Sequence, residues 1–126
     1  MPLKYRLVQR SNPRQPQAPK KFHAKAVTRG QVKLRQLAEE IAQISTLSTV
    51  DTIAVIEAFI QLIPKHLTQG EIVRLGDFGS FAIGLASEAA LQEEAFNAAM
   101  IKKLKIYFRP VKQLKKALTA VEFEKV

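Results

Sequence analysis

The chain begins with an alternation of apolar and polar side chains that is typical of a half-buried strand. The alternation covers residues 3–9, and a shorter one covers residues 21–28. Between them, residues 12–19 contain three prolines, and proline cannot donate a hydrogen bond to a strand ladder. We therefore predict two short strands joined by a loop or an extended connector.

From Leu34 onward the apolar positions recur at the spacing of a helix. The positions that would form one stripe of this first helix are Leu34, Leu37, Ala38, Ile41 and Ala42. A second helix is expected from about Val50 to Leu67. Ser48 and Asp51 stand at the spacing of a capping box that would begin it, and Gly70 would end it as a left-handed cap. Because this second helix is apolar over most of its surface, we expect it to pack between two other surfaces.

The remaining pattern predicts a hairpin, a return strand and a final helix. Residues 71–85 predict two strands around a turn at residues 76–79, where two glycines would supply positive φ. Residues 86–99 show no clear period and would form a loop, a short helix or the tip of a long hairpin. Alternation resumes over residues 102–109, which predicts a return strand, and Pro110 suits the first turn of a final helix.

Size and composition indicate one folded domain, with or without an extension. The 126 residues are 47% hydrophobic and 25% charged, which is too short for two independent cores and too apolar for a disordered polyelectrolyte. Cysteine is absent, which excludes disulfides, thiolate zinc sites and cysteine nucleophiles. No apolar run approaches a membrane span, and the first residues do not resemble a signal peptide. We therefore expect a soluble, cytoplasmic protein with no membrane partner.

Positive charge is concentrated at the two ends of the chain. The formal net charge is +9; residues 1–35 carry +10 without one acidic residue, residues 36–101 carry -7, and residues 102–126 carry +6. Charge runs are often no more than solvated surface, and that interpretation stays open for each single lysine. An unbroken basic segment of this length exceeds what solubility requires and would attract a polyanion. Nucleic acid is therefore the expected partner.

No group of side chains predicts an enzyme. His23 and His66 have no acidic or hydroxyl neighbour at the spacing of a metal site or a catalytic triad, so each is expected on the surface. The glycines of residues 76–79 lie in a turn rather than before a helix, unlike a phosphate-binding loop. Glu93 and Glu94 are adjacent and would diverge by about 100° on a helix. We expect no catalytic residues, no cofactor, no metal and no small-molecule substrate.

Two motifs in a fixed order point to a known family. They are residues 70–81 (GEIVRLGDFGSF) and residues 108–115 (FRPVKQLK). Together with the order of predicted elements, they resemble the HU and integration-host-factor family of bacterial histone-like DNA-binding proteins over about residues 32–122. Because a basic extension precedes this region, the chain is most similar to the variant histone-like group of Bacteroidetes-type bacteria.

The resemblance implies an α+β fold that forms an intertwined homodimer. Its parts would be a helical pair, a three-stranded antiparallel sheet with an arm, and a C-terminal helix. Residues 1–31 would be a basic N-terminal β extension with two short strands and a proline-rich connector, and residues 32–126 an HU-like DNA-binding and dimerisation domain.

The residues support a dimer independently of the resemblance. The second helix and four phenylalanines present more apolar surface than one thin sheet over two helices can cover. The phenylalanines are Phe59, Phe78, Phe81 and Phe108. A monomer whose core is closed by the N-terminal strands is the alternative.

The predicted arm departs from the family pattern. In the family the arm is basic and ends in a proline that wedges between base pairs and kinks the DNA. Residues 82–107 contain no proline here, and Glu88, Glu93 and Glu94 lie near their middle. Because phosphate repels carboxylates, proline-driven bending is not predicted, and this arm would fold back or contact protein.

We therefore expect non-sequence-specific binding of double-stranded DNA by a nucleoid-associated architectural protein, through contacts with the phosphate backbone. Candidate contacts in the HU-like region are Arg74, Lys102, Lys103, Lys105, Arg109, Lys112, Lys115 and Lys116. Further contacts from the extension would be Arg6, Arg10, Arg14, Lys20 and Lys21. Alternatively, the two N-terminal strands would only cover an exposed sheet edge.

Two other functions remain open. One is a structural or assembly protein that has the HU fold and binds other proteins through its acidic arm and basic extension; partner recovery that survives nuclease treatment would favour it. RNA binding is a weaker alternative, because the aromatic residues occur singly and do not form a paired stacking platform.

Overall fold

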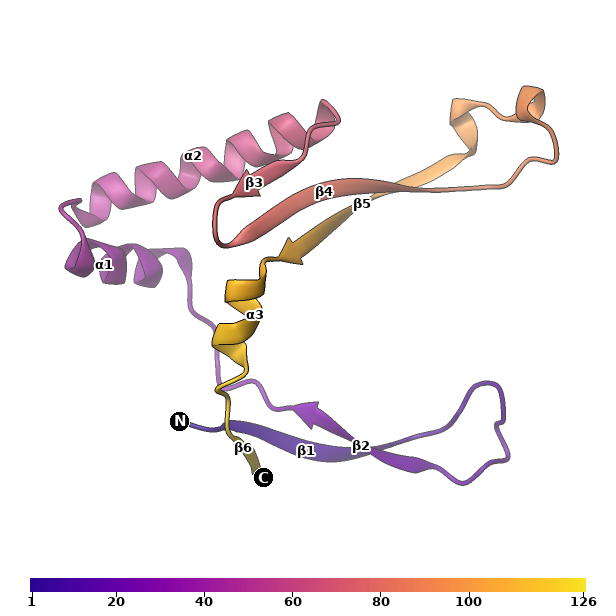
Figure 1. Cartoon of the computed structure of the whole chain (residues 1–126), viewed down its shortest axis with the longest axis horizontal. Coiled ribbons are helices and arrows are strands. Elements are labelled where there is room, and N and C mark those ends of the chain that lie inside the picture. The colour runs from indigo at the N-terminus through magenta and orange to yellow at the C-terminus, as the bar shows by residue number, and fades with distance from the viewer. The chain divides into compact units, whose positions relative to one another are not determined.

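The computed structural model describes residues 1–126 as an α+β chain with three α-helices and two three-stranded sheets (Figure 1). The chain divides into two compact units. Residues 1–31 and 118–126 form the first unit, and residues 32–117 form the second. Each unit has its own sheet.

The first unit is a sheet built from both ends of the chain. β1 (Leu3–Arg10) pairs antiparallel with β2 (Lys21–Ala26) and parallel with β6 (Phe123–Lys125). The two predicted N-terminal strands are confirmed. β6 was not predicted. It is three residues long and pairs with the other end of the chain, so no local pattern in the sequence marks it.

The second unit begins with two helices that pack against each other. α1 is Leu34–Ile44, and α2 is Thr49–Thr68. The predicted cap of α2 is confirmed on one side, because the Ser48 hydroxyl accepts a hydrogen bond of 3.0 Å from the Asp51 N–H. Ala38 of α1 is completely buried, and Leu67 near the end of α2 is 3% exposed.

The second sheet has the order β3-β4-β5, and its strands run antiparallel. β3 is Val73–Leu75, β4 is Gly79–Ser87 and β5 is Ile101–Pro110. β4 and β5 continue beyond the short β3 as a two-stranded arm (Figure 1). Residues 88–100 join them through two single 3₁₀ turns, η1 (Glu93–Ala95) and η2 (Ala98–Met100).

The turn between β3 and β4 corrects one expectation about its two glycines. Gly76 has a positive φ of 49°, but Gly79 does not. Gly79 is instead required by close packing: a Cβ there would lie 2.6 Å from the Arg109 carbonyl oxygen and 2.6 Å from the Phe108 ring. The Phe108 ring also contacts the rings of Phe78 and Phe81, at centroid distances of 5.2 and 5.0 Å.

The start of the last helix differs from the prediction. α3 is Lys112–Leu118, whereas we expected Pro110 in its first turn. Pro110 instead ends β5, opposite Gly79, where a residue without an N–H is tolerated at the end of an edge strand. The Val111 N–H donates to the Phe78 carbonyl at 3.2 Å, which fixes α3 to the hairpin turn.

The expectation that α2 packs between two surfaces is not met within one chain. α2 contacts α1, β3 and β4, yet Val50 is 75% and Ile60 52% exposed. Ala38 and Leu67 are the only buried apolar residues. The chain exposes 11171 Å², whereas two separate compact units of these lengths would expose roughly 8000 Å². The apolar surface of α2 is therefore left uncovered by the chain itself.

Candidate nucleic-acid interface

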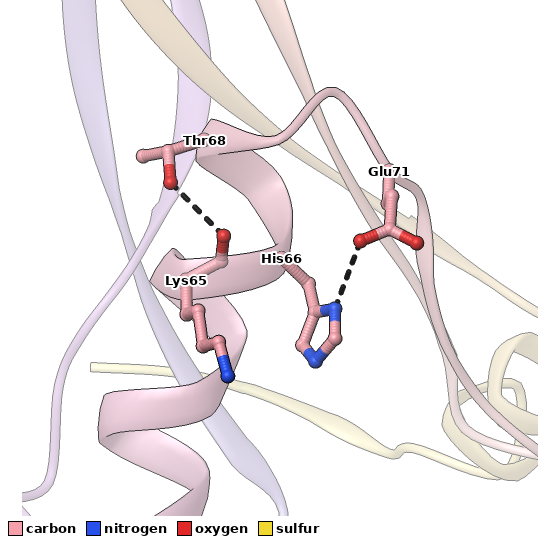
Figure 2. Close-up of polar contacts among 4 residues, drawn as sticks. All are labelled: Lys65, His66, Thr68 and Glu71. Carbon is pink, nitrogen blue, oxygen red and sulfur yellow. Dashed lines mark hydrogen bonds and ion pairs between the residues drawn. The ribbon is translucent and has the colours of Figure 1, made fainter.

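The reversal from α2 into β3 sets the position of the first basic side chain of the sheet. Gly70 adopts a φ of 82°, as predicted, and its N–H donates to the Leu67 carbonyl at 3.0 Å. His66 Nδ1 lies 2.9 Å from Glu71 Oε1 across this turn (Figure 2). His66 is exposed, as expected, but its contact with Glu71 was not predicted, because the left-handed cap brings the residue after Gly70 back beside the helix.

The same close-up shows how the last turn of α2 is held. The Thr68 hydroxyl donates to the Lys65 carbonyl at 3.0 Å (Figure 2). The His66 and Glu71 side chains are 46% and 56% exposed, so their contact closes the turn at the surface rather than in a pocket. No group of three or more His, Cys, Asp or Glu side chains in the chain has the geometry of a metal site. The His66–Glu71 contact joins the last turn of α2 to the residues that lead into β3.

The strand register divides the second sheet into an apolar and a basic face. Residues directly opposite each other in paired strands project to the same face. Phe81 lies opposite Val73 and Phe108, so these three side chains share one face. The rest of that face is formed by Leu75, Ile83, Leu85, Leu104 and Ile106.

The opposite side of this sheet carries all of its unpaired cations, and we call it the basic sheet face. Its charged members are Arg74, Lys103, Lys105 and Arg109. All four side chains are exposed. None of them forms an ion pair, and no acidic residue lies on this face. The strand register thus brings four of the candidate contacts together, three from the predicted alternation in residues 102–109 and Arg74 from β3.

Small residues separate these cations across the sheet. Ser80 lies between Arg74 and Arg109 in one cross-strand row. Along β4, the remaining positions of this face are Ala82, Gly84 and Ala86. Because none of these side chains is longer than that of serine, the basic side chains project beyond the central strand β4.

Tyr107 lies on the same face, and its ring covers the neighbouring strand. A Cβ at Gly84 would lie 2.4 Å from the Tyr107 ring. The absence of a side chain at Gly84 therefore makes room for the Tyr107 ring. Sequence reasoning placed Tyr107 on the side of Lys103 and Lys105 but missed the role of Gly84, which depends on the register of two strands.

Lys102 lies apart from the basic sheet face. Ala86 pairs with Lys103, but the next residue, Ser87, pairs with Ile101. Lys102 has no partner in β4 and is therefore the extra residue of a β-bulge. Its ammonium lies 2.9 Å from Glu88 Oε1. Lys102 therefore neutralises an acidic residue of the arm, which leaves it less available to phosphate than its neighbours.

The remaining candidates lie on three other elements. α3 holds Lys112, Lys115 and Lys116 within seven residues. Arg6 and Arg10 are in β1, and Lys21 begins β2. Arg14 and Lys20 lie in the connector between those strands, outside the ladder. The structure thus assigns the candidates of the extension to a different unit from the basic sheet face.

The chain is similar to known proteins both in sequence pattern and in fold. The sequence model of a family described as "HU domain fused to wHTH, Ig, or Glycine-rich motif" matches residues 1–125. Among solved structures, the chain is similar to a candidate bacterial DNA-binding protein from Bacteroides vulgatus ATCC 8482, with a TM-score of 0.68 and 17% sequence identity. The similarity covers 98% of this chain and 47% of that protein, so this chain spans about half its length. At this identity the likeness shows the fold alone, and no curated protein sequence matches.

Proposed function

The chain belongs to the family of HU domains fused to wHTH, Ig or glycine-rich motifs, and on this premise we propose that it binds double-stranded DNA through its basic sheet face. The binding would use the phosphate backbone and would not depend on base sequence. The protein would act as an architectural component of the bacterial nucleoid. The description of the Bacteroides protein as a candidate DNA-binding protein is consistent with this role.

The observation that carries the proposal is the register of the second sheet. It places Arg74, Arg109 and two lysines on one side, with no carboxylate among them. Each phosphate that such a side chain neutralises releases condensed counterions, which contributes about 0.9 to the slope of log affinity against log salt. Four contacts on one chain would therefore produce a slope of about -3.6.

The composition of this face favours contacts with phosphate over contacts with base edges. It contains no asparagine or glutamine, the side chains that pair with adenine in the major groove, so guanine is the base that its arginines and lysines could pair with. Lys103 and Lys105 bind phosphate as point charges rather than in a fixed bidentate geometry. We therefore infer that different duplex sequences bind with similar affinity.

We further propose that the binding species is a homodimer. Phe59 is 46% exposed on α2, beside the exposed Ile60 and Leu62. Burying such a side chain contributes roughly 1.5 to 3 kcal/mol, so a second copy that covers α2 would stabilise both chains. No helix is long and apolar enough to cross a membrane.

An assembly role remains the second candidate, and one feature of the arm favours it. Leu91 is fully exposed between the arm strands, close in sequence to Glu93 and Glu94. Carboxylates and a free leucine suit a protein partner better than a phosphate backbone. This role predicts partner capture through the arm that persists after nuclease treatment.

A binding series measured by fluorescence anisotropy tests the proposed function. The full chain is titrated with labelled DNA duplex, single-stranded DNA and RNA duplex across a range of salt. Preferential binding of DNA duplex, weakening steeply with salt, supports the proposal. Equal binding of all three ligands, or binding that does not respond to salt, contradicts it.

A further inference from the structure

The N-terminal sheet also has one basic face, and the register shows which residues form it. Arg6 lies directly opposite Lys25, and Arg10 lies directly opposite Lys21. Paired residues share a face, so these four side chains project to the same side of the β1–β2 hairpin. We call Arg6, Arg10, Lys21 and Lys25 the hairpin cationic face.

The other face of the same hairpin is apolar. Leu7 lies opposite Ala24, and Tyr5 lies opposite Ala26. Phe22 lies on this side as well, opposite Gln9. The hairpin therefore separates its charges completely, which the sequence alternation alone did not establish because it did not give the register between the strands.

This arrangement of charges opposes the folding of the hairpin. Like charges directly opposite each other in an antiparallel pair are destabilising, and here two such pairs occur within one ladder. None of the four side chains forms an ion pair. The only acidic residue in the sheet is Glu124, which lies opposite Lys4 in β6, on the same face and one row from the Arg6/Lys25 pair, so this face of the sheet carries five basic side chains and one carboxylate. Stability of the strands does not explain this pattern, whereas a bound polyanion does.

The spacing of the two pairs narrows the class of polyanion. Arg10 is four residue steps after Arg6 along β1. At roughly 3.3 Å per step, their Cα atoms are about 13 Å apart. The major groove of B-form DNA is about 12 Å wide and admits a two-stranded β-ribbon. The two rows of charge thus match the phosphates on the two sides of that groove. The major groove of an RNA helix is narrow and deep and does not match.

We propose that the hairpin cationic face is a second site for duplex DNA, in which the Arg6/Lys25 and Arg10/Lys21 pairs contact phosphates on opposite sides of a major groove. Val8 and His23 lie between the pairs and face the groove floor. The choice of duplex DNA as ligand rests on the proposed function, but the site itself is separate from the basic sheet face. It also changes the set of extension contacts, since Lys25 joins it and Arg14 and Lys20 lie outside it.

Matched double variants of the full chain test this site. Arg6→Gln with Lys25→Gln removes one pair from the face, and Arg14→Gln with Lys20→Gln removes the same charge from the connector of the same unit. The first variant should lower the salt slope of DNA binding by about 1.8 per bound chain, which corresponds to two contacts on each chain. The connector variant should leave the slope as in the wild type. Equal slopes for both variants would overturn the proposal.

The same series separates this site from the basic sheet face. If Arg74→Gln with Lys105→Gln leaves binding unchanged while Arg6→Gln with Lys25→Gln weakens it, the hairpin site is supported and the basic sheet face is not. The reverse result supports the basic sheet face alone and overturns the hairpin site. No binding of DNA duplex by the wild type would overturn both. RNA duplex bound as tightly as DNA duplex would contradict the match to the major groove.

DNA cleavage by a reagent attached to the hairpin tests the same site without removing any basic side chain. The chain contains no cysteine, so Val8→Cys allows a DNA-cleaving reagent to be attached at one position between the two pairs. Leu7→Cys places the same reagent on the apolar face of the same strand. Cleavage from position 8 at least several-fold above that from position 7 supports the site. Equal cleavage from both positions would overturn it.

Discussion

Arg74 and Arg109 are both register partners of Ser80, in the strands on either side of β4. Their guanidinium groups therefore project from the same face, with Cα positions about 10 Å apart across two strand spacings. β3 contributes Arg74 only because the cap at Gly70 returns the chain directly after α2. The fold thus joins cations from distant positions in the sequence into one surface.

Neutralising this row should weaken DNA binding without changing sequence preference. For Arg74→Gln with Arg109→Gln, we expect the salt slope to fall by about 1.8 per chain, or about 3.6 for the proposed homodimer, because each chain loses two phosphate contacts. Arg35→Gln is the control, because Arg35 is exposed on α1 and pairs with Glu39 at 3.5 Å, away from the sheet. A change in preference among duplex sequences would show that the two arginines read bases.

Lys102 and Lys105 should behave differently although both are exposed lysines of β5. Lys105 lies on the basic sheet face, opposite Gly84, whereas Lys102 pairs with Glu88. Lys105→Gln should reduce the slope of log affinity against log salt by about 0.9 per bound chain, and Lys102→Gln should change this slope by much less. Anisotropy titrations at several salt concentrations measure both. Similar losses for the two variants would place the DNA on the arm itself rather than on the basic sheet face.

Substituting the two glycines of β4 should lower the free energy of unfolding by different amounts. A Cβ at Gly79 would meet the Arg109 backbone, which cannot move without breaking the pairing of β4 with β5, whereas a Cβ at Gly84 would meet only the Tyr107 ring. Gly79→Ala should lower the free energy of unfolding by about 1 to 3 kcal/mol, and Gly84→Ala by less. Urea unfolding at one fixed protein concentration gives both values. A larger loss for Gly84→Ala would contradict the packing described for Gly79.

The exposed face of α2 predicts the state of association. Phe59→Asp should shift the protein from dimer towards monomer in sedimentation experiments and lower its stability, because a carboxylate would be buried against the second copy. Leu91→Asp makes the same chemical change at a side chain that is fully exposed in the arm, and it should leave the dimer intact. A wild-type protein that sediments as a stable monomer would refute the dimer.

The sequence predicted the elements whose pattern is local. The helical stripe beginning at Leu34 and the cap residues Ser48 and Gly70 mark α1 and α2 because their chemistry acts within a few residues. The alternation in residues 102–109 likewise identified the side of β5 that carries Lys103 and Lys105.

What the sequence could not show depends on pairing between distant residues. β6 exists because Phe123 lies beside Leu3, and no local period records that contact. The role of Gly84 requires the register with Tyr107, and the loss of Lys102 from the face requires the bulge beside Ser87. The pairing of Arg6 with Lys25 depends on the register between β1 and β2. The proline-rich connector between these strands did not show which residues would lie opposite each other.

The most direct test of the central claim is the salt dependence of binding to DNA duplexes of several unrelated sequences. We predict a slope of log affinity against log salt of about -3.6 per chain, from the four contacts of its basic sheet face, and therefore of about -7.2 or steeper for the proposed homodimer, with the same slope for every sequence. A slope near zero, or one sequence bound far more tightly than the others, would contradict the account.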